Sequence, residues 1–69
     1  MYYDLINILK RAEITLLELS QKIDISYVSL YHKIKGRFDW KIKEMLLIQS
    51  IVNQKLNTNY TLDELFKRG

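Results

Sequence analysis

Residues 14–36 read ITLLELSQKIDISYVSLYHKIKG, and this stretch decides the fold. Thr15 and Glu18 have the spacing of a helix capping box. In that motif the hydroxyl accepts a hydrogen bond from the backbone N–H three residues on, and the carboxylate reaches back to the start. Ser26 is a favourable N-cap for a following helix. Gly36 ends that helix in the way a left-handed C-terminal glycine would. The stretch therefore predicts two short helices in succession.

The connection between these two helices is very short. Only Asp24 and Ile25 separate them, and so tight a link forces the helices to cross at a steep angle. Asp24 is expected to adopt left-handed backbone, which aspartate visits more readily than most residues. We therefore predict a helix-turn-helix over residues 15–35.

The rest of the chain has the same helical character. Strand-type alternation never persists, and apolar residues recur instead at intervals of three and four. These positions are Leu5, Ile8, Leu9, Ala12, Leu16, Leu19, Ile23, Leu30, Ile34, Ile42, Met45, Leu46, Leu62, Leu65 and Phe66. A fourth helix is predicted from Asp39, the best available cap, to about Lys55, because a start at Lys41 would have a poor cap.

A short last helix is predicted over residues 61–67, where Thr61 and Glu64 repeat the capping-box spacing. The predicted fold is all-α, with five helices in a single domain over residues 1–69. Phe38 and Trp40 are expected to be core anchors.

Composition narrows the function. The chain has 69 residues, no cysteine, one histidine and a net charge of +3. No carboxylate cluster with metal-ligand spacing and no glycine-rich phosphate loop is visible, so we expect no enzyme, no metal and no cofactor. The longest apolar run is four residues, far below the roughly 20 that span a bilayer. The N-terminus has no signal-peptide pattern, so the expected compartment is the cytoplasm. Residues 33–43 carry five cationic residues against one acidic residue, a pattern that favours phosphate binding.

In this order and spacing, the motifs resemble a known family. The chain is similar to the small Cro and repressor helix-turn-helix proteins of temperate phages and bacteria, the XRE or lambda-repressor-like type. The resemblance covers nearly the whole chain and is carried by Ile14-Thr15, Glu18-Leu19, Lys22 to Ser26, Leu30, His32 to Gly36, Phe38 to Trp40, Ile42 to Glu44, and Thr61 to Phe66.

The resemblance implies a phage-type transcription regulator in a bacterial host cell. The third helix would lie in the major groove of double-stranded operator DNA, and such proteins usually bind as dimers to half-sites about 34 Å apart. The implied base-reading residues are Tyr27, Val28, Ser29, Tyr31 and His32, with Leu30 and Ile34 pointing inward. Tyr, Ser and His can hydrogen-bond base edges, and Val28 can touch a thymine methyl group. The implied phosphate contacts are Thr15, Lys33, Lys35, Arg37, Lys41 and Lys43.

Two departures from the family pattern open an alternative. The second helix begins with Leu16 and Leu17, where the family usually has a polar phosphate-binding residue. The exposed side of the third helix has no Arg, Gln or Asn. The residues Leu16, Leu17, Tyr27, Val28 and Tyr31 could therefore form an apolar patch that binds a partner repressor protein or a second copy, or some of them could complete a thin core. For a homodimer, Ile51, Leu56 and Phe66 are further candidates.

Overall fold

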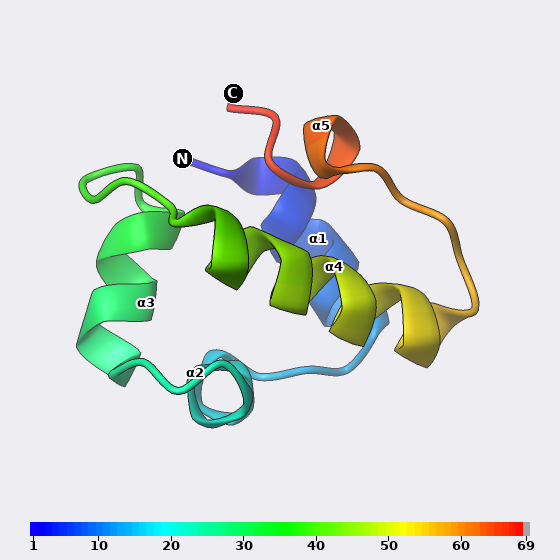
Figure 1. Ribbon diagram of the computed structural model, residues 1–69, viewed down its shortest axis with the longest axis horizontal. Helices are drawn as coiled ribbons and strands as arrows, with labels where there is room; N and C mark the ends of the chain where they lie inside the picture. Colours follow the sequence, from blue (N-terminus) through cyan, green and yellow to red (C-terminus); the bar gives the residue numbers. More distant parts are fainter. Residues whose placement is uncertain (69) are drawn as a thin grey trace.

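Five helices follow one another along residues 1–68, as Figure 1 shows. The computed structural model describes residues 1–68. Its helices are α1 (Tyr3–Arg11), α2 (Leu16–Lys22), α3 (Tyr27–Ile34), α4 (Ile42–Leu56) and α5 (Leu62–Leu65). No strand occurs among the described residues. The predicted all-α, five-helix architecture is confirmed.

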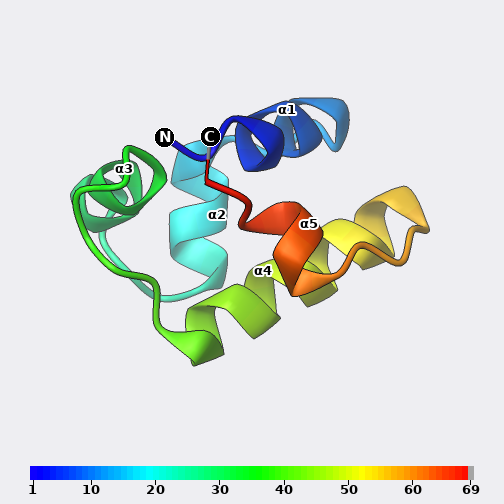
Figure 2. The ribbon, with the colours of Figure 1, turned by 90° about the horizontal axis from the view of Figure 1, so that it is seen from above.

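The helices pack against one another in two groups. α5 packs against both α1 and α4, and α2 packs against α3. Figure 1 looks nearly along the axis of α2 while α3 lies across the view, so these two helices cross steeply, as the short connection predicts. Figure 2 shows the same molecule from above, with the N-terminal segment beside the segment that follows α5. The Arg68 guanidinium lies 6.0 Å from the centre of the Tyr2 ring. The Tyr2 N–H donates to the Ile34 carbonyl at 3.1 Å, which ties the N-terminus to the end of α3.

One side of each helix supplies the core. The helical spacing in the sequence brings these side chains onto one face of each element, where burial removes apolar surface from water. The buried apolar residues are Leu5, Ile8, Leu9, Ala12, Ile14, Leu19, Ile23, Leu30, Ile34, Ile48, Val52 and Leu65. Leu30 and Ile34 point inward as predicted, so the opposite side of α3 is left for solvent.

Hydroxyl caps start three of the helices. Thr15, Ser26 and Thr61 each accept a hydrogen bond from the backbone N–H three residues on, at 3.0 to 3.1 Å. At Thr61 the Glu64 carboxylate also accepts from the Thr61 N–H at 2.9 Å, which completes the predicted capping box. The last helix itself ends at residue 65, two residues earlier than predicted.

Left-handed residues end the helices. Asp24 and Gly36 have φ values of 59° and 84°, as predicted for the turn and for the end of α3. After Gly36 the Arg37 N–H donates to the His32 carbonyl at 2.9 Å, which closes the end of the helix. Glu13, at the end of α1, also has a positive φ of 57°, which the sequence did not predict because glutamate is not a typical residue for that conformation.

The predicted start of α4 at Asp39 is wrong. The helix begins at Ile42, with Lys41 in the N-cap position. The reason is the Glu44 carboxylate, which accepts a hydrogen bond from the Lys41 N–H at 3.0 Å. This bond satisfies the backbone N–H of the N-cap residue. Asp39 is exposed and lies outside the helix.

The residues that face inward on α4 are not those that its apolar spacing predicts. Ile42 and Leu46 are 61% and 50% exposed, whereas Glu44, Ile48 and Val52 are the buried residues of the helix. Those three residues are spaced by four and lie on one face. An ionisable group therefore occupies the first inward position of α4.

The aromatic residues after α3 take different positions. Trp40 is half-buried against the core, with ring-centroid distances of 5.9 Å to Tyr2 and 5.1 Å to Phe66. Phe38 is 49% exposed, so its predicted role as a core anchor is wrong. The ring of Phe38 lies instead against His32 at 4.9 Å, outside the core.

Candidate nucleic-acid interface

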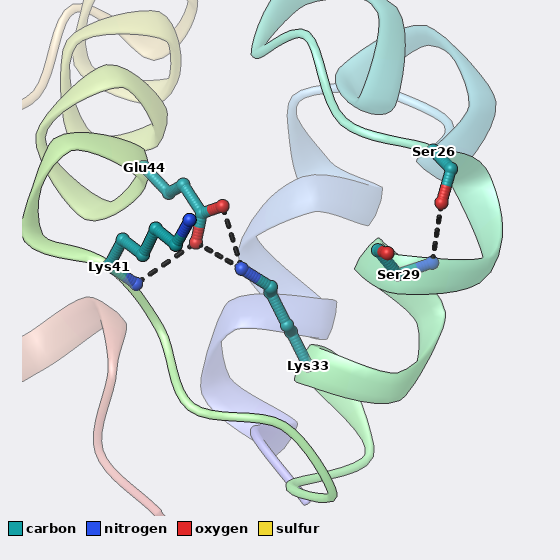
Figure 3. Close-up of polar contacts among 5 residues, drawn as sticks. All are labelled: Ser26, Ser29, Lys33, Lys41 and Glu44. Atoms are coloured by element: carbon teal, nitrogen blue, oxygen red, sulfur yellow. Dashed lines mark hydrogen bonds and ion pairs between the residues drawn. The ribbon is translucent and has the colours of Figure 1, made fainter.

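The start of α3 is held by Ser26. Its hydroxyl oxygen accepts a hydrogen bond from the Ser29 N–H at 3.0 Å, as Figure 3 shows. This bond satisfies one of the free N–H groups of the first turn and fixes how the chain enters the helix. The first two helical residues, Tyr27 and Val28, both lie exposed on the outside.

The residues expected to read bases lie on the outward side of α3. Tyr27, Val28 and Tyr31 are exposed, and Ser29 and His32 are half-buried. With Leu30 and Ile34 in the core, the outward side is the only part of the helix that a ligand can reach. All five expected positions therefore remain available for contact.

Two cationic side chains flank the C-terminal half of α3. The Lys35 ammonium lies 5.4 Å from the centre of the Tyr31 ring, a distance at which the ring face attracts a cation. An Arg37 guanidinium nitrogen lies 3.3 Å from His32 Nδ1. Positive charge is thus adjacent to the aromatic side chains of the outward face, at the positions expected to contact phosphate.

Three further expected phosphate contacts lie at helix starts. Lys41 and Lys43 are exposed at the start of α4. Thr15 is exposed at the start of α2, where its oxygen accepts the Glu18 N–H and its own proton is free to be donated.

Lys33 must be removed from the expected phosphate contacts. It is buried on the inward side of α3, and its ammonium donates to both Glu44 carboxylate oxygens, at 2.5 and 2.6 Å (Figure 3). A buried ammonium with two charged hydrogen bonds cannot turn outward to a phosphate without leaving the Glu44 charge unpaired. The exposed charge of this segment comes instead from residues 35–43.

The Glu44 carboxylate is stabilised in its ionised form. Burial alone raises the pKa of Glu44, but the hydrogen bonds from the Lys33 ammonium and the Lys41 N–H outweigh it, so the pKa lies below its ordinary value. The carboxylate therefore bridges α3 to the first turn of α4. This ion pair was not predicted from the sequence, although each residue lies on the buried side of its helix.

The apolar patch expected from the sequence divides into two parts. Leu17, Tyr27, Val28 and Tyr31 are between 37% and 62% exposed. Leu16 is instead half-buried against the core and lines a groove of about 600 Å³ between α1, the start of α2 and the end of α3. Tyr31 and Lys35 also line this groove, so it opens beside the outward face of α3.

The residues considered for a dimer are only partly exposed. Ile51, Leu56 and Phe66 are half-buried and pack against the core of their own chain. The exposed apolar side chains of α4 are Ile42, Leu46 and Leu47. Ile42 and Leu46 belong to the apolar pattern predicted from the sequence, so their exposure shows that this pattern does not mark the inward face of α4. Leu47 was not part of that pattern.

Other kinds of site find little support in the described part of the chain. Within residues 1–68, no group of three or more His, Cys, Asp or Glu side chains is placed to hold a metal ion. None of the helices described combines the length and apolar character needed to cross a bilayer. A comparison with protein-family models finds no match, and comparisons with curated proteins and with solved structures find none either.

Proposed function

We propose that this chain is a DNA-binding transcription regulator of the Cro and repressor kind, which inserts α3 into the major groove of operator DNA. One observation carries the proposal. α2 and α3 cross steeply through a short turn, and the outward side of α3 is flanked by Lys35 and Arg37. A helix of this size fits the major groove, and cations at its edges can neutralise the phosphates on either side.

Different parts of the chain would supply affinity and sequence preference. Lys35, Arg37, Lys41 and Lys43 would hold phosphates and set the register, because phosphate contacts supply affinity with little sequence information. The first turns of α3 would determine which DNA sequence is preferred, because the N-terminal part of a recognition helix contacts the base edges. The bound state would be a two-fold dimer, with one copy of α3 in each half-site.

The test is a salt titration of DNA binding. Fluorescence anisotropy of the full chain on duplex DNA should show affinity that falls steeply with salt. The Lys35→Ala/Arg37→Ala variant should bind more weakly to every sequence, with the slope of log K against log salt shallower by about 1.8. Lys55→Ala is the matched control, because Lys55 is an exposed lysine at the far end of α4 and should leave the slope unchanged. Equal slopes for all three proteins would disprove the phosphate assignment.

A second candidate function uses the same face for a protein. Leu17, Tyr27, Val28 and Tyr31 are exposed apolar or aromatic residues, a composition typical of protein interfaces. Here the chain would act as a modulator or antirepressor that binds a partner repressor. If the purified chain binds no duplex DNA at low salt but forms a complex with a purified partner repressor, this second function replaces the first.

A further inference from the structure

We propose that the start of α3 reads the C5-methyl groups of pyrimidines, so that its preferred half-site has thymine at the contacted positions and also accepts 5-methylcytosine there. This inference rests on the proposed DNA-binding function and specifies which bases that site recognises. It starts from the two side chains that the Ser26 cap presents, Tyr27 and Val28.

The outward side of α3 lacks the side chains that most often read purine bases. Guanine is read most often by Arg or Lys, and adenine by Asn or Gln, through paired hydrogen bonds. Residues 27–32 include none of these four side chains. The one lysine within α3, Lys33, is buried in its ion pair with Glu44. Purine edges therefore have no paired reader at the start of this helix.

The outward side of α3 instead presents the apolar side chain of Val28. Val28 is 62% exposed, the most exposed of the large apolar side chains in the described residues. A valine in a helix has one strongly preferred rotamer, so its methyl groups are already fixed and lose little entropy on binding. Tyr27 lies beside it on the helix and adds an exposed aromatic ring.

The Val28 side chain is complementary to thymine in the major groove. The thymine C5-methyl is the one apolar group that an unmodified base pair exposes in the major groove. Against a G·C pair, Val28 would cover polar groups without bonding to them, which costs free energy. Against thymine it would bury two apolar surfaces. Lys35 and Arg37, at the other end of α3, would secure the phosphates in both cases, so Val28 would change sequence preference more than overall affinity.

Methyl reading has a consequence for modified DNA. The methyl group of 5-methylcytosine occupies the same place in the groove as that of thymine. A site in which cytosine replaces a contacted thymine should therefore regain part of its affinity when that cytosine is methylated. The regulator would then respond to cytosine methylation at positions where an ordinary cytosine is rejected.

The test begins with duplexes selected by the full-length chain from a random library. Each thymine of the selected site is then replaced by deoxyuridine, which removes the methyl group and keeps base pairing and the other groove atoms. We expect about a fourfold loss of affinity at each contacted position, the effect of one buried methyl group. Thymine to cytosine should weaken binding, and 5-methylcytosine at that position should restore part of it.

The Val28→Ala variant completes a double-mutant cycle. It should bind the thymine duplex more weakly than the wild-type chain does, and it should no longer distinguish thymine from deoxyuridine. Leu47→Ala is the matched control, because it shortens an exposed aliphatic side chain on another helix. The deoxyuridine series uses the wild-type chain, so it decides the question even if Val28→Ala folds poorly.

The outcomes separate the two proposals. If the selected sites bind with steep salt dependence but deoxyuridine has no effect at any position, methyl reading is overturned and DNA binding stands. If no duplex is enriched or bound at low salt, both proposals are overturned. A loss confined to one or two thymines, absent in Val28→Ala, supports methyl reading.

Discussion

Removing one partner of the Lys33–Glu44 ion pair should destabilise the protein severely. The pair joins the inward side of α3 to the first turn of α4, and both residues are more than nine-tenths buried. Lys33→Met keeps the length and the apolar stem of the side chain but removes its charge. The Glu44 carboxylate would then be buried with only the Lys41 N–H as a hydrogen-bond donor.

The expected loss is large for so small a chain. Leaving one charge of a buried pair unpaired costs about 3–5 kcal/mol. A domain of this length has roughly 3–10 kcal/mol of stability in total. At about 4 °C or more per kcal/mol, the melting temperature should fall by at least about 12 °C. The Lys33→Met/Glu44→Leu double variant should recover at least half of that loss, because it removes both charges and leaves the Lys41 N–H at an exposed position where water can accept it.

Circular dichroism with heating and with urea measures these changes. Lys43→Met is the matched control, because it makes the same substitution at an exposed lysine of α4 and should change stability by no more than about 0.5 kcal/mol. If Lys33→Met costs less than about 1 kcal/mol, or if the double variant is worse than either single one, Lys33 is not held in a buried pair. Its exclusion from phosphate binding would then be withdrawn.

Four further outcomes are expected. Because the pKa of Glu44 is lowered in the fold, its stabilising contribution is present above the pKa of the unfolded residue, about 4.3, and is lost as the pH falls below it. Melting temperatures from pH 7 to 3 should therefore fall more steeply for the wild type than for Glu44→Gln, and parallel curves would contradict this. Gly36→Ala should cost about 1–2 kcal/mol, because alanine is strained at a φ of 84°, and an unchanged urea midpoint would show that the turn adapts. Ser26→Ala should cost about 1 kcal/mol through loss of the α3 cap, whereas Ser26→Asp should retain it. Val28→Ser should alter stability by no more than about 0.5 kcal/mol, and a larger loss would place Val28 in the core.

The sequence predicted most of the fold because its local signals agree with one another. The hydroxyl caps at Thr15, Ser26 and Thr61 are each made by a bond within a single helical turn, so the nearby residues determine them. The left-handed turns at Asp24 and Gly36 are determined just as locally. These features place the helix-turn-helix correctly, and with it the outward side of α3.

One error comes from a side chain within the same helical turn, and the other comes from residues far away in the sequence. Asp39 is a better cap than Lys41 by residue type, yet α4 starts after Lys41 because Glu44 supplies the acceptor. Phe38 is apolar enough for the core, but the Trp40 ring packs there against Tyr2 and Phe66, residues near the two ends of the chain. The residue type at position 38 or 40 does not predict these long-range ring contacts.

The position of Lys33 could nevertheless have been deduced from the sequence. It follows Leu30 by three residues, so on a helix its side chain lies about 60° around the axis from Leu30, on the side away from Ile34 and at the edge of the buried face. Glu44 precedes Ile48 by four and occupies the same kind of position on α4. A lone charge at either position would be too costly to bury, whereas opposite charges that meet there offset part of that cost. The helical register of a lysine, and not its place in a basic run, therefore determines whether its charge is exposed.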